Sequence, residues 1–133
     1  MIKEEIKVAK VLKAALKGGL VAAGVNIAWL YVLEFTIGLK DLPQGFPVAV
    51  VISSILPIFL GGLLYAYLAK NLQKGRLLFL IISIGFAVLS IFPSFQTTMA
   101  DGNPAPHNFA VLTVPMHFFA TLIGLYFIIK KSN

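Results

Sequence analysis

The chain has 133 residues, of which 59% are hydrophobic and only 12% are charged. Soluble domains carry about 25% charged residues, so a soluble domain of this length could not cover so much apolar surface. The net charge is +6, but the basic residues lie beside the ends of apolar runs and form no patch with interleaved aromatic residues, which excludes a nucleic-acid partner. The absence of cysteine excludes disulfides and thiolate metal sites.

The first 16 residues predict a basic amphipathic helix. Lysines recur every three or four residues on one helical face, at Lys3, Lys7, Lys10, Lys13 and Lys17. Such a face suits binding to an anionic membrane surface, and a solvated tail that only sets topology is the alternative. The apolar run that follows is too long for the core of a signal peptide, so we expect it to be retained as the first span.

Four apolar runs divide the chain, at about 17–37, 47–69, 77–95 and 108–129. At ~1.5 Å per residue, each is long enough to cross a ~30 Å hydrocarbon core. The connections at 38–46 and 96–107 are rich in Gly, Pro and Asn, whereas 70–76 is a short basic turn. The sequence therefore predicts an all-α fold, with residues 1–133 forming a single membrane domain, a four-helix bundle of up-down-up-down topology.

The basic residues also predict the orientation of the bundle. Ten of the 11 Lys and Arg residues lie at the termini or in the middle turn, and only Lys40 lies on the other side. Because Lys and Arg accumulate on the cytoplasmic side of membrane proteins, we expect both termini to be cytoplasmic.

Each predicted span carries one stripe of small or polar residues at helical spacing. Such residues let membrane helices approach closely or form hydrogen bonds, so we expect the stripes to face inward. They are Ala15, Gly19, Ala23 and Asn26; Ser53, Pro57 and Gly61; Ser83, Ala87, Ser90 and Ser94; and Thr113, His117, Thr121 and Gly124.

Five of the polar or helix-breaking residues are candidate ligand or proton sites: His117, Asn26, Glu34, Ser90 and Pro57. An ionisable residue inside a membrane is a functional hypothesis by default, and His117 is the ionisable group well inside the fourth span. Pro57 frees a backbone carbonyl at a similar depth. The alternative is that His117 and Asn26 hydrogen-bond and hold two helices in register. Glu34 is interpreted as an interfacial carboxylate or, if it faces the bundle, a proton or cation site.

Some short motifs give the chain a family resemblance. These are Gly24, Val25 and Asn26 in the first span, the basic turn ending at Arg76, and the pair Met116 and His117 in the last span. On them the chain resembles a group of small bacterial four-helix membrane proteins of unknown function. The resemblance implies a bacterial inner membrane and carries over no activity.

No sequence motif predicts an enzyme, a metal site or a cofactor. The two histidines lie ten residues, ~15 Å, apart on the predicted fourth helix and cannot jointly hold one haem within a monomer. We therefore expect a non-enzymatic bundle with an accessory, structural or hydrophobic-ligand-binding role, whose partners are the lipid bilayer and either a second copy or another membrane protein. The alternatives are a small proton-coupled transporter acting as an oligomer and a haem- or quinone-associated membrane subunit.

Overall fold

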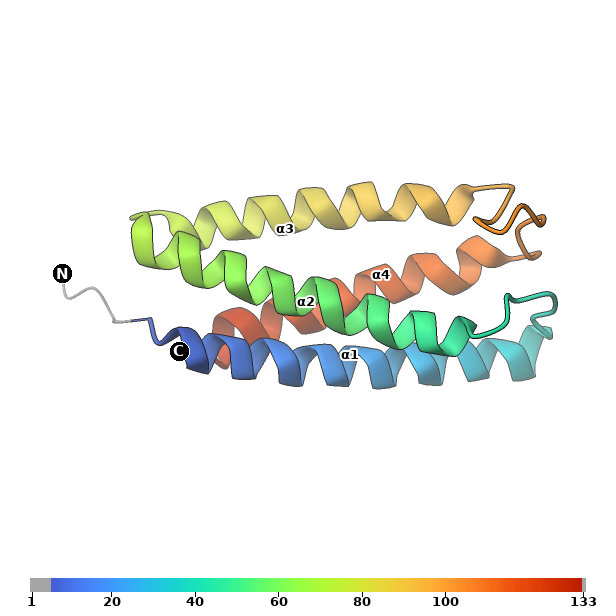
Figure 1. Cartoon of the computed structure of the whole chain (residues 1–133), viewed down its shortest axis with the longest axis horizontal. Coiled ribbons are helices and arrows are strands. Elements are labelled where there is room, and N and C mark those ends of the chain that lie inside the picture. The colour runs from blue at the N-terminus through green and yellow to red at the C-terminus, as the bar shows by residue number, and fades with distance from the viewer. Residues whose placement is uncertain (1–5, 133) are drawn as a thin grey trace.

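The computed structural model describes residues 6–132, and these form an antiparallel bundle of four long helices (Figure 1). The helices are α1 (Val8–Ile37), α2 (Phe46–Asn71), α3 (Gly75–Ile91) and α4 (Phe109–Leu125). A 3₁₀ turn, Phe92–Phe95, extends α3, and a π-helical turn, Tyr126–Lys130, extends α4. The predicted all-α four-helix fold is thus confirmed, and each of these four helices, with its extension, is long and apolar enough to cross a membrane.

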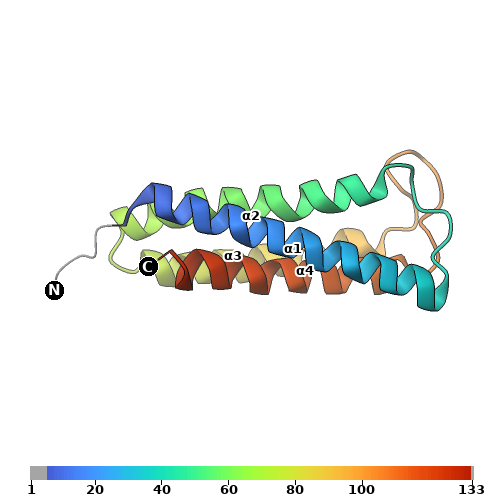
Figure 2. The same cartoon turned by 90° about the horizontal axis from the view of Figure 1, so that it is seen from below.

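Successive helices run in opposite directions and lie side by side around the bundle. α1 packs against α2 and α4, and α3 packs against the same two helices from the opposite side (Figures 1 and 2). The two ends of the described chain, Ile6 and Ser132, lie at one end of the bundle, which we call the terminal end, together with the α2–α3 turn. The two longer connections lie at the other end, the loop end.

The basic segment is continuous with the first span. α1 begins at Val8 and runs for 30 residues. In its first turns Val11 and Ala15 are fully buried in the bundle, whereas Lys7, Lys10 and Lys13 are exposed. These turns therefore belong to the bundle core on one face and carry lysines on the other. Lys3 lies outside the described residues.

Glycine permits the close approach of α1 and α2. A Cβ atom placed on Gly62 would lie 2.6 Å from the Cβ of Ala15, and one placed on Gly19 would lie 3.0 Å from the Cα of Ile55. Contacts this short leave no room for a methyl group. The small stripe predicted for the first span is accordingly buried along its whole length, from Ala15 to Asn26.

The inward face of α2 differs from the prediction. Its buried residues include Val50, Ser54, Ile58 and Gly62, whereas Ser53 and Pro57 are exposed. The predicted stripe of Ser53, Pro57 and Gly61 therefore lies one residue away from the true contact face. The reason is that Gly62, and not Gly61, meets Ala15 of α1, which turns the predicted stripe toward α3.

Two apolar clusters form the core, one in each half of the bundle. The terminal half is built around Ala15, Ile58, Tyr65, Phe79 and Ile128. The loop half consists of Leu30, Leu33, Val50, Leu112 and Met116. Between the two clusters lies the buried polar pair Asn26 and Ser54.

The third helix is held less tightly than the others. Its buried residues are Gly75 and Phe79, both in its first two turns, and the ring of Phe79 packs edge-on against Tyr65 at a centroid distance of 5.1 Å. Gly75 is required by the turn, because a Cβ there would overlap the backbone of Leu68. Beyond Phe79, Ser83, Ala87 and Ser90 are only half-buried on the inward face. α3 is thus anchored at the terminal end, stands away from the bundle along its middle, and is held again at the loop end, where Ser94 of its 3₁₀ extension is buried and the extension packs against α4.

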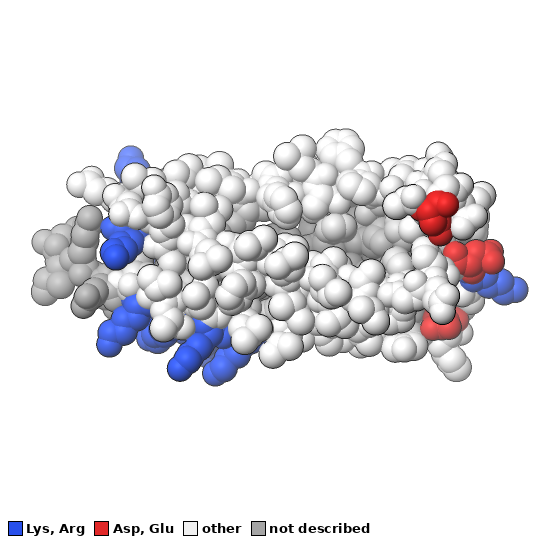
Figure 3. All heavy atoms as spheres, viewed as in Figure 1, with Lys and Arg blue, Asp and Glu red and all other residues white. Residues whose placement is uncertain are grey.

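Charge separates along the long axis of the bundle. Lys and Arg gather at the terminal end, and the acidic residues of the described chain gather at the loop end (Figure 3). Those acids are Glu34, Asp41 and Asp101. The middle of the visible face carries neither kind of charge, as expected for the part of a multi-pass membrane protein that lies in hydrocarbon.

Candidate functional site: a lateral cavity

A cavity of about 490 Å³ lies where α3 stands away from α2 and α4. Figure 3 shows the molecular surface hollowed between α2 and α3 on this face. Ligand sites in proteins have volumes of roughly 300–1,000 Å³, so the space suits a small molecule. Because the cavity opens sideways from the spanning helices, its entrance faces the lipid.

Three polar residues, one from each helix, form what we call the polar ring of the cavity: Ser53, Ser90 and His117. Helix register places them at similar depth. Gly124 of α4 packs so closely against α2 that a Cβ placed on it would lie 3.0 Å from Cγ1 of Ile58. Counting outward from that contact at ~1.5 Å per residue, Ser53 and His117 differ in depth along the bundle axis by less than one helical turn, ~5 Å.

Three further polar residues, Ser54, Ser83 and Thr121, also line the cavity, and the rest of its wall, toward the terminal end, is apolar. It includes Leu60, Leu64, Phe79, Leu125 and Ile128. From Ser90 to Phe79 along α3, and from His117 to Ile128 along α4, the distance is ~16 Å at the rise of an α-helix. The cavity is therefore an elongated apolar slot with a polar ring near its loop end.

His117 lines this cavity and is half-buried. Its backbone carbonyl accepts a hydrogen bond from the hydroxyl of Thr121 at 2.8 Å. Its imidazole ring, however, has no hydrogen-bond partner among residues 6–132. A neutral imidazole offers one N–H donor and one nitrogen acceptor, and both are unused in the cavity wall.

Pro57 adds an unused backbone acceptor to the same wall. Proline has no amide hydrogen, so in the interior of α2 it cannot donate to the carbonyl four residues earlier, that of Ser53. Ser53 and Pro57 both line the cavity. The Ser53 hydroxyl donates to the carbonyl of Val50 at 3.2 Å. The backbone carbonyl of Ser53 lacks its usual helical donor because of Pro57, so it offers an acceptor at the level of the polar ring.

The other serines of the wall differ in how far they are already satisfied. The Ser90 hydroxyl donates to the carbonyl of Ala87 at 2.8 Å, so only its lone pairs remain for a ligand. Ser83 lies deeper in the slot and has no hydrogen-bond partner in the described part of the chain. Ser83 belonged to the predicted inward stripe but was not among the candidate site residues, because its spacing could not distinguish a cavity wall from a helix contact.

Asn26 lies apart from the cavity, between α1 and α2. Its side-chain amide donates to the Ser54 hydroxyl at 2.9 Å, and that hydroxyl donates to the Val50 carbonyl at 2.7 Å. Both side chains are buried. The hydrogen bond expected between Asn26 and His117 is not formed. Asn26 instead links the first two helices, with its Oδ1 atom buried and without a partner in residues 6–132.

Glu34 and the lysines lie outside the cavity. Glu34 is exposed near the loop end of α1 and does not face the bundle interior. Lys7, Lys10, Lys13 and Lys17 are exposed on α1 at the terminal end. Lys130 and Lys131 lie over the ring of Tyr126, with Nζ atoms 5.7 and 5.8 Å from its centroid.

Trp29 contributes to packing in a way that sequence reasoning missed. Its position near the loop end of α1 is typical of an interfacial aromatic belt. In the structure its indole N–H donates to the carbonyl of Leu112 at 3.1 Å, and its ring packs edge-on against Phe119. Tyr31 and Phe35, in contrast, are exposed as a belt requires. Trp29 thus ties α1 to α4.

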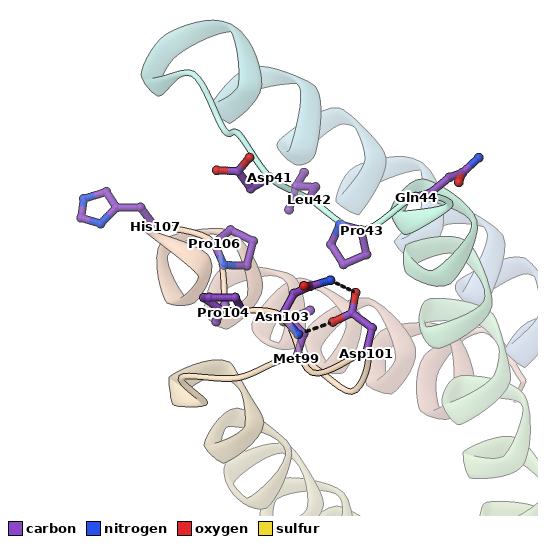
Figure 4. Close-up of a pocket in the computed structure, with 11 residues that line it drawn as sticks. Asp41, Leu42, Pro43, Gln44, Met99, Asp101, Asn103, Pro104, Pro106 and His107 are labelled. Carbon is purple, nitrogen blue, oxygen red and sulfur yellow. Dashed lines mark hydrogen bonds between the residues drawn. The ribbon is translucent and has the colours of Figure 1, made fainter.

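A second cavity, of about 510 Å³, lies between the two connections at the loop end (Figure 4). Both the backbone N–H and the side-chain amide of Asn103 donate to the Asp101 carboxylate at 3.0 Å. These bonds, the backbone one first, hold the pKa of Asp101 below its ordinary value. The side chains of His107 and Gln44 point away from the cavity, and no three His, Asp or Glu residues within 6–132 are placed to hold a metal ion. The hydrogen bonds between Asn103 and Asp101 therefore stabilise a turn in the loop and do not form a ligand site.

Comparisons with protein-family models, with curated proteins and with solved structures find no match for this chain.

Proposed function

We propose that this membrane protein binds a lipophilic ligand in the lateral cavity. The observation that carries the proposal is the cavity between α2, α3 and α4, whose wall holds the unpartnered imidazole of His117. A polar group in hydrocarbon without a hydrogen-bond partner is costly. Binding of a ligand that satisfies this group would remove that cost, whereas a wall meant only for packing would be apolar.

The proposal also states how the bundle is oriented and in which membrane it lies. The two ends of the described chain and the basic α2–α3 turn lie at one end of the bundle, and the acids of the described residues lie at the other. With Lys and Arg on the cytoplasmic side, the loop end faces outward. The resemblance to small bacterial proteins favours the bacterial inner membrane, and the exposed lysines of α1 suit its anionic cytoplasmic surface.

Ligand binding has more support than proton-coupled transport. Such transport would need an ionisable group on a path across the bundle, and Glu34, the acid of the first span, is exposed near the loop end of α1. His117 is the ionisable residue of the cavity wall. The wall closes toward the terminal end on Phe79 and Ile128, both buried, so the cavity forms a pocket.

The test uses two glycines at comparable positions in helices. A side chain at Gly61 would point toward Ile128 and Phe79 in the cavity, whereas Gly24 has open space around it on the lipid face of α1. We expect native mass spectrometry of the purified protein to show one bound lipophilic molecule per chain. We expect Gly61→Leu to lose it and Gly24→Leu to retain it. Ligand-free wild type, or equal retention by both variants, would contradict the proposal; thermal unfolding checks that both variants are folded.

A further inference from the structure

We infer that the ligand is a single-chain amphiphile with a hydroxyl-bearing head, a long-chain alcohol or an undissociated fatty acid. Its head would lie at the polar ring and its chain would run along the apolar slot toward the terminal end. This inference rests on the proposed function and specifies its ligand class and orientation.

The hydrogen-bonding groups of the polar ring select the head. His117 offers a donor and an acceptor, and the carbonyl freed by Pro57 offers a second acceptor. A head that only accepts, such as an ester or a ketone, could satisfy the imidazole N–H but would leave the Ser53 carbonyl unpaired. A hydroxyl or carboxyl group both donates and accepts, so it can satisfy His117 and Ser53 together.

The absence of nearby charge selects a neutral head. No Lys or Arg belongs to the cavity wall within residues 6–132. A carboxylate in an apolar site without a partner charge would be strongly destabilised, and such a group takes up a proton instead. An acid would therefore bind in its protonated form, with the same –OH chemistry as an alcohol.

Depth excludes an ordinary two-chain phospholipid as the specific ligand. His117 lies about two turns, ~12 Å, inside α4 from its first residue, Phe109. The ester and phosphate groups of a bilayer phospholipid lie at the interface, so its acyl chain could enter the slot but its oxygen atoms could not reach the polar ring. A small head on one chain can reach this depth.

The apolar slot has the length and shape to hold the alkyl chain of the ligand. Below the polar ring the wall is apolar for ~16 Å along α3 and α4, and it narrows at the terminal end where Phe79 and Ile128 meet Gly61. Ser83 and Thr121 are the polar exceptions in this stretch, and the Thr121 hydroxyl already donates to the backbone carbonyl of His117. A chain entering sideways between α2 and α3 would therefore lie parallel to the helices and point toward the terminal end.

The head is tested by competition against cis-parinaric acid, a fluorescent fatty acid, bound to the detergent-solubilised protein. We expect 1-hexadecanol to half-displace the probe at about tenfold lower concentration than methyl palmitate or hexadecane, because each net hydrogen bond corresponds to roughly a factor of ten. Palmitic acid should match 1-hexadecanol only at acidic pH, where its carboxyl group is protonated. His117→Phe keeps an aromatic ring, slightly larger than imidazole, but removes its hydrogen-bonding nitrogens. It should weaken the binding of 1-hexadecanol about tenfold and leave that of hexadecane unchanged. His107→Phe, in the exposed loop, should change neither.

The direction in which the ligand's alkyl chain lies is tested with two neighbouring leucines of α2. Leu64 lines the inner part of the slot, whereas Leu63 is exposed and outside it. Leu64→Trp should weaken the binding of 1-hexadecanol at least tenfold and leave the binding of the shorter 1-octanol unchanged. Leu63→Trp should change the binding of neither alcohol. If none of the probes binds, the proposed function fails. If hexadecane and methyl palmitate bind as tightly as hexadecanol, with no effect of His117→Phe, the cavity binds ligands but the inference is overturned.

Discussion

Ser53 and Ser54 are neighbours in the chain with different surroundings. Ser54 is 2% exposed and bonds to Asn26, whereas Ser53 is exposed; both residues border the lateral cavity. Both hydroxyls donate to the same backbone carbonyl, that of Val50. The difference arises from their side-chain direction, since adjacent residues point about 100° apart on an α-helix. Ser54 therefore joins α1 to α2 at the edge of the cavity, whereas Ser53 makes no side-chain hydrogen bond to another helix within residues 6–132.

This difference gives a test of the Asn26–Ser54 hydrogen bond. In a double-mutant cycle of Asn26→Ala and Ser54→Ala, we expect a coupling of about 0.6 kcal/mol, and no more than about 1.7 kcal/mol, in the range of interhelical hydrogen bonds in membranes. The free energy of unfolding in mixed detergent micelles gives the value. The matched cycle of Asn26→Ala with Ser53→Ala should show no coupling. Equal coupling in both cycles would show that the hydrogen bond is not formed as described.

At the scale of the helix, α1 and α2 are joined chiefly by small residues. A Cβ atom on Gly62 would fall 2.6 Å from the Cβ of Ala15, and Ala15 itself is fully buried. Without a hydrophobic drive between helices in lipid, this close packing is a main source of association. The helix pair should therefore tolerate very little added volume at these two positions.

We expect Gly62→Ala to destabilise the bundle by about 1–3 kcal/mol, because the added methyl group forces the two helices apart. Thermal unfolding in detergent measures the change. Gly24→Ala, in open space on the lipid face, should be neutral or stabilising by up to about 1 kcal/mol, since alanine is the better helix former. The combination Ala15→Gly with Gly62→Ala moves the methyl group to the other helix and should restore much of the lost stability; no recovery would argue against this contact.

The stripes show how far sequence could predict the elements and the site. For α1 the stripe from Ala15 to Asn26 was right, and the neighbouring small residues Ala14, Gly18 and Ala22 are buried beside it, so both small faces of this helix point inward. For α2 two overlapping faces contain small residues, Ser53 with Gly61 and Ser54 with Gly62, and spacing alone cannot choose between them. The cavity could not be predicted at all, since it depends on how far α3 stands from its neighbours. His117 was identified because an imidazole in a span is unusual, but its surroundings required the fold.

At the scale of the whole molecule, the distribution of charge predicts the topology. Gln73 lies in the exposed α2–α3 turn at the terminal end, and Gln44 lies in an exposed connection at the loop end. Since the chain has no cysteine, a single introduced thiol reports its own side of the membrane. Gln44→Cys should react with a membrane-impermeant maleimide in intact bacterial spheroplasts, and Gln73→Cys only after permeabilisation. The reverse pattern would invert the assigned orientation.

The length of α1 has a consequence for the surrounding bilayer. Thirty residues extend ~45 Å, well beyond a ~30 Å hydrocarbon core. A lone helix would accommodate this mismatch by tilting. α1 is not free to tilt alone, because Val11 and Ala15 are locked into the core at its terminal end. The excess must project into the head-group layer, where the lysines can extend to the phosphates. The height of those lysines then fixes how deeply the whole bundle is immersed, and a thicker or thinner bilayer would have to deform around it.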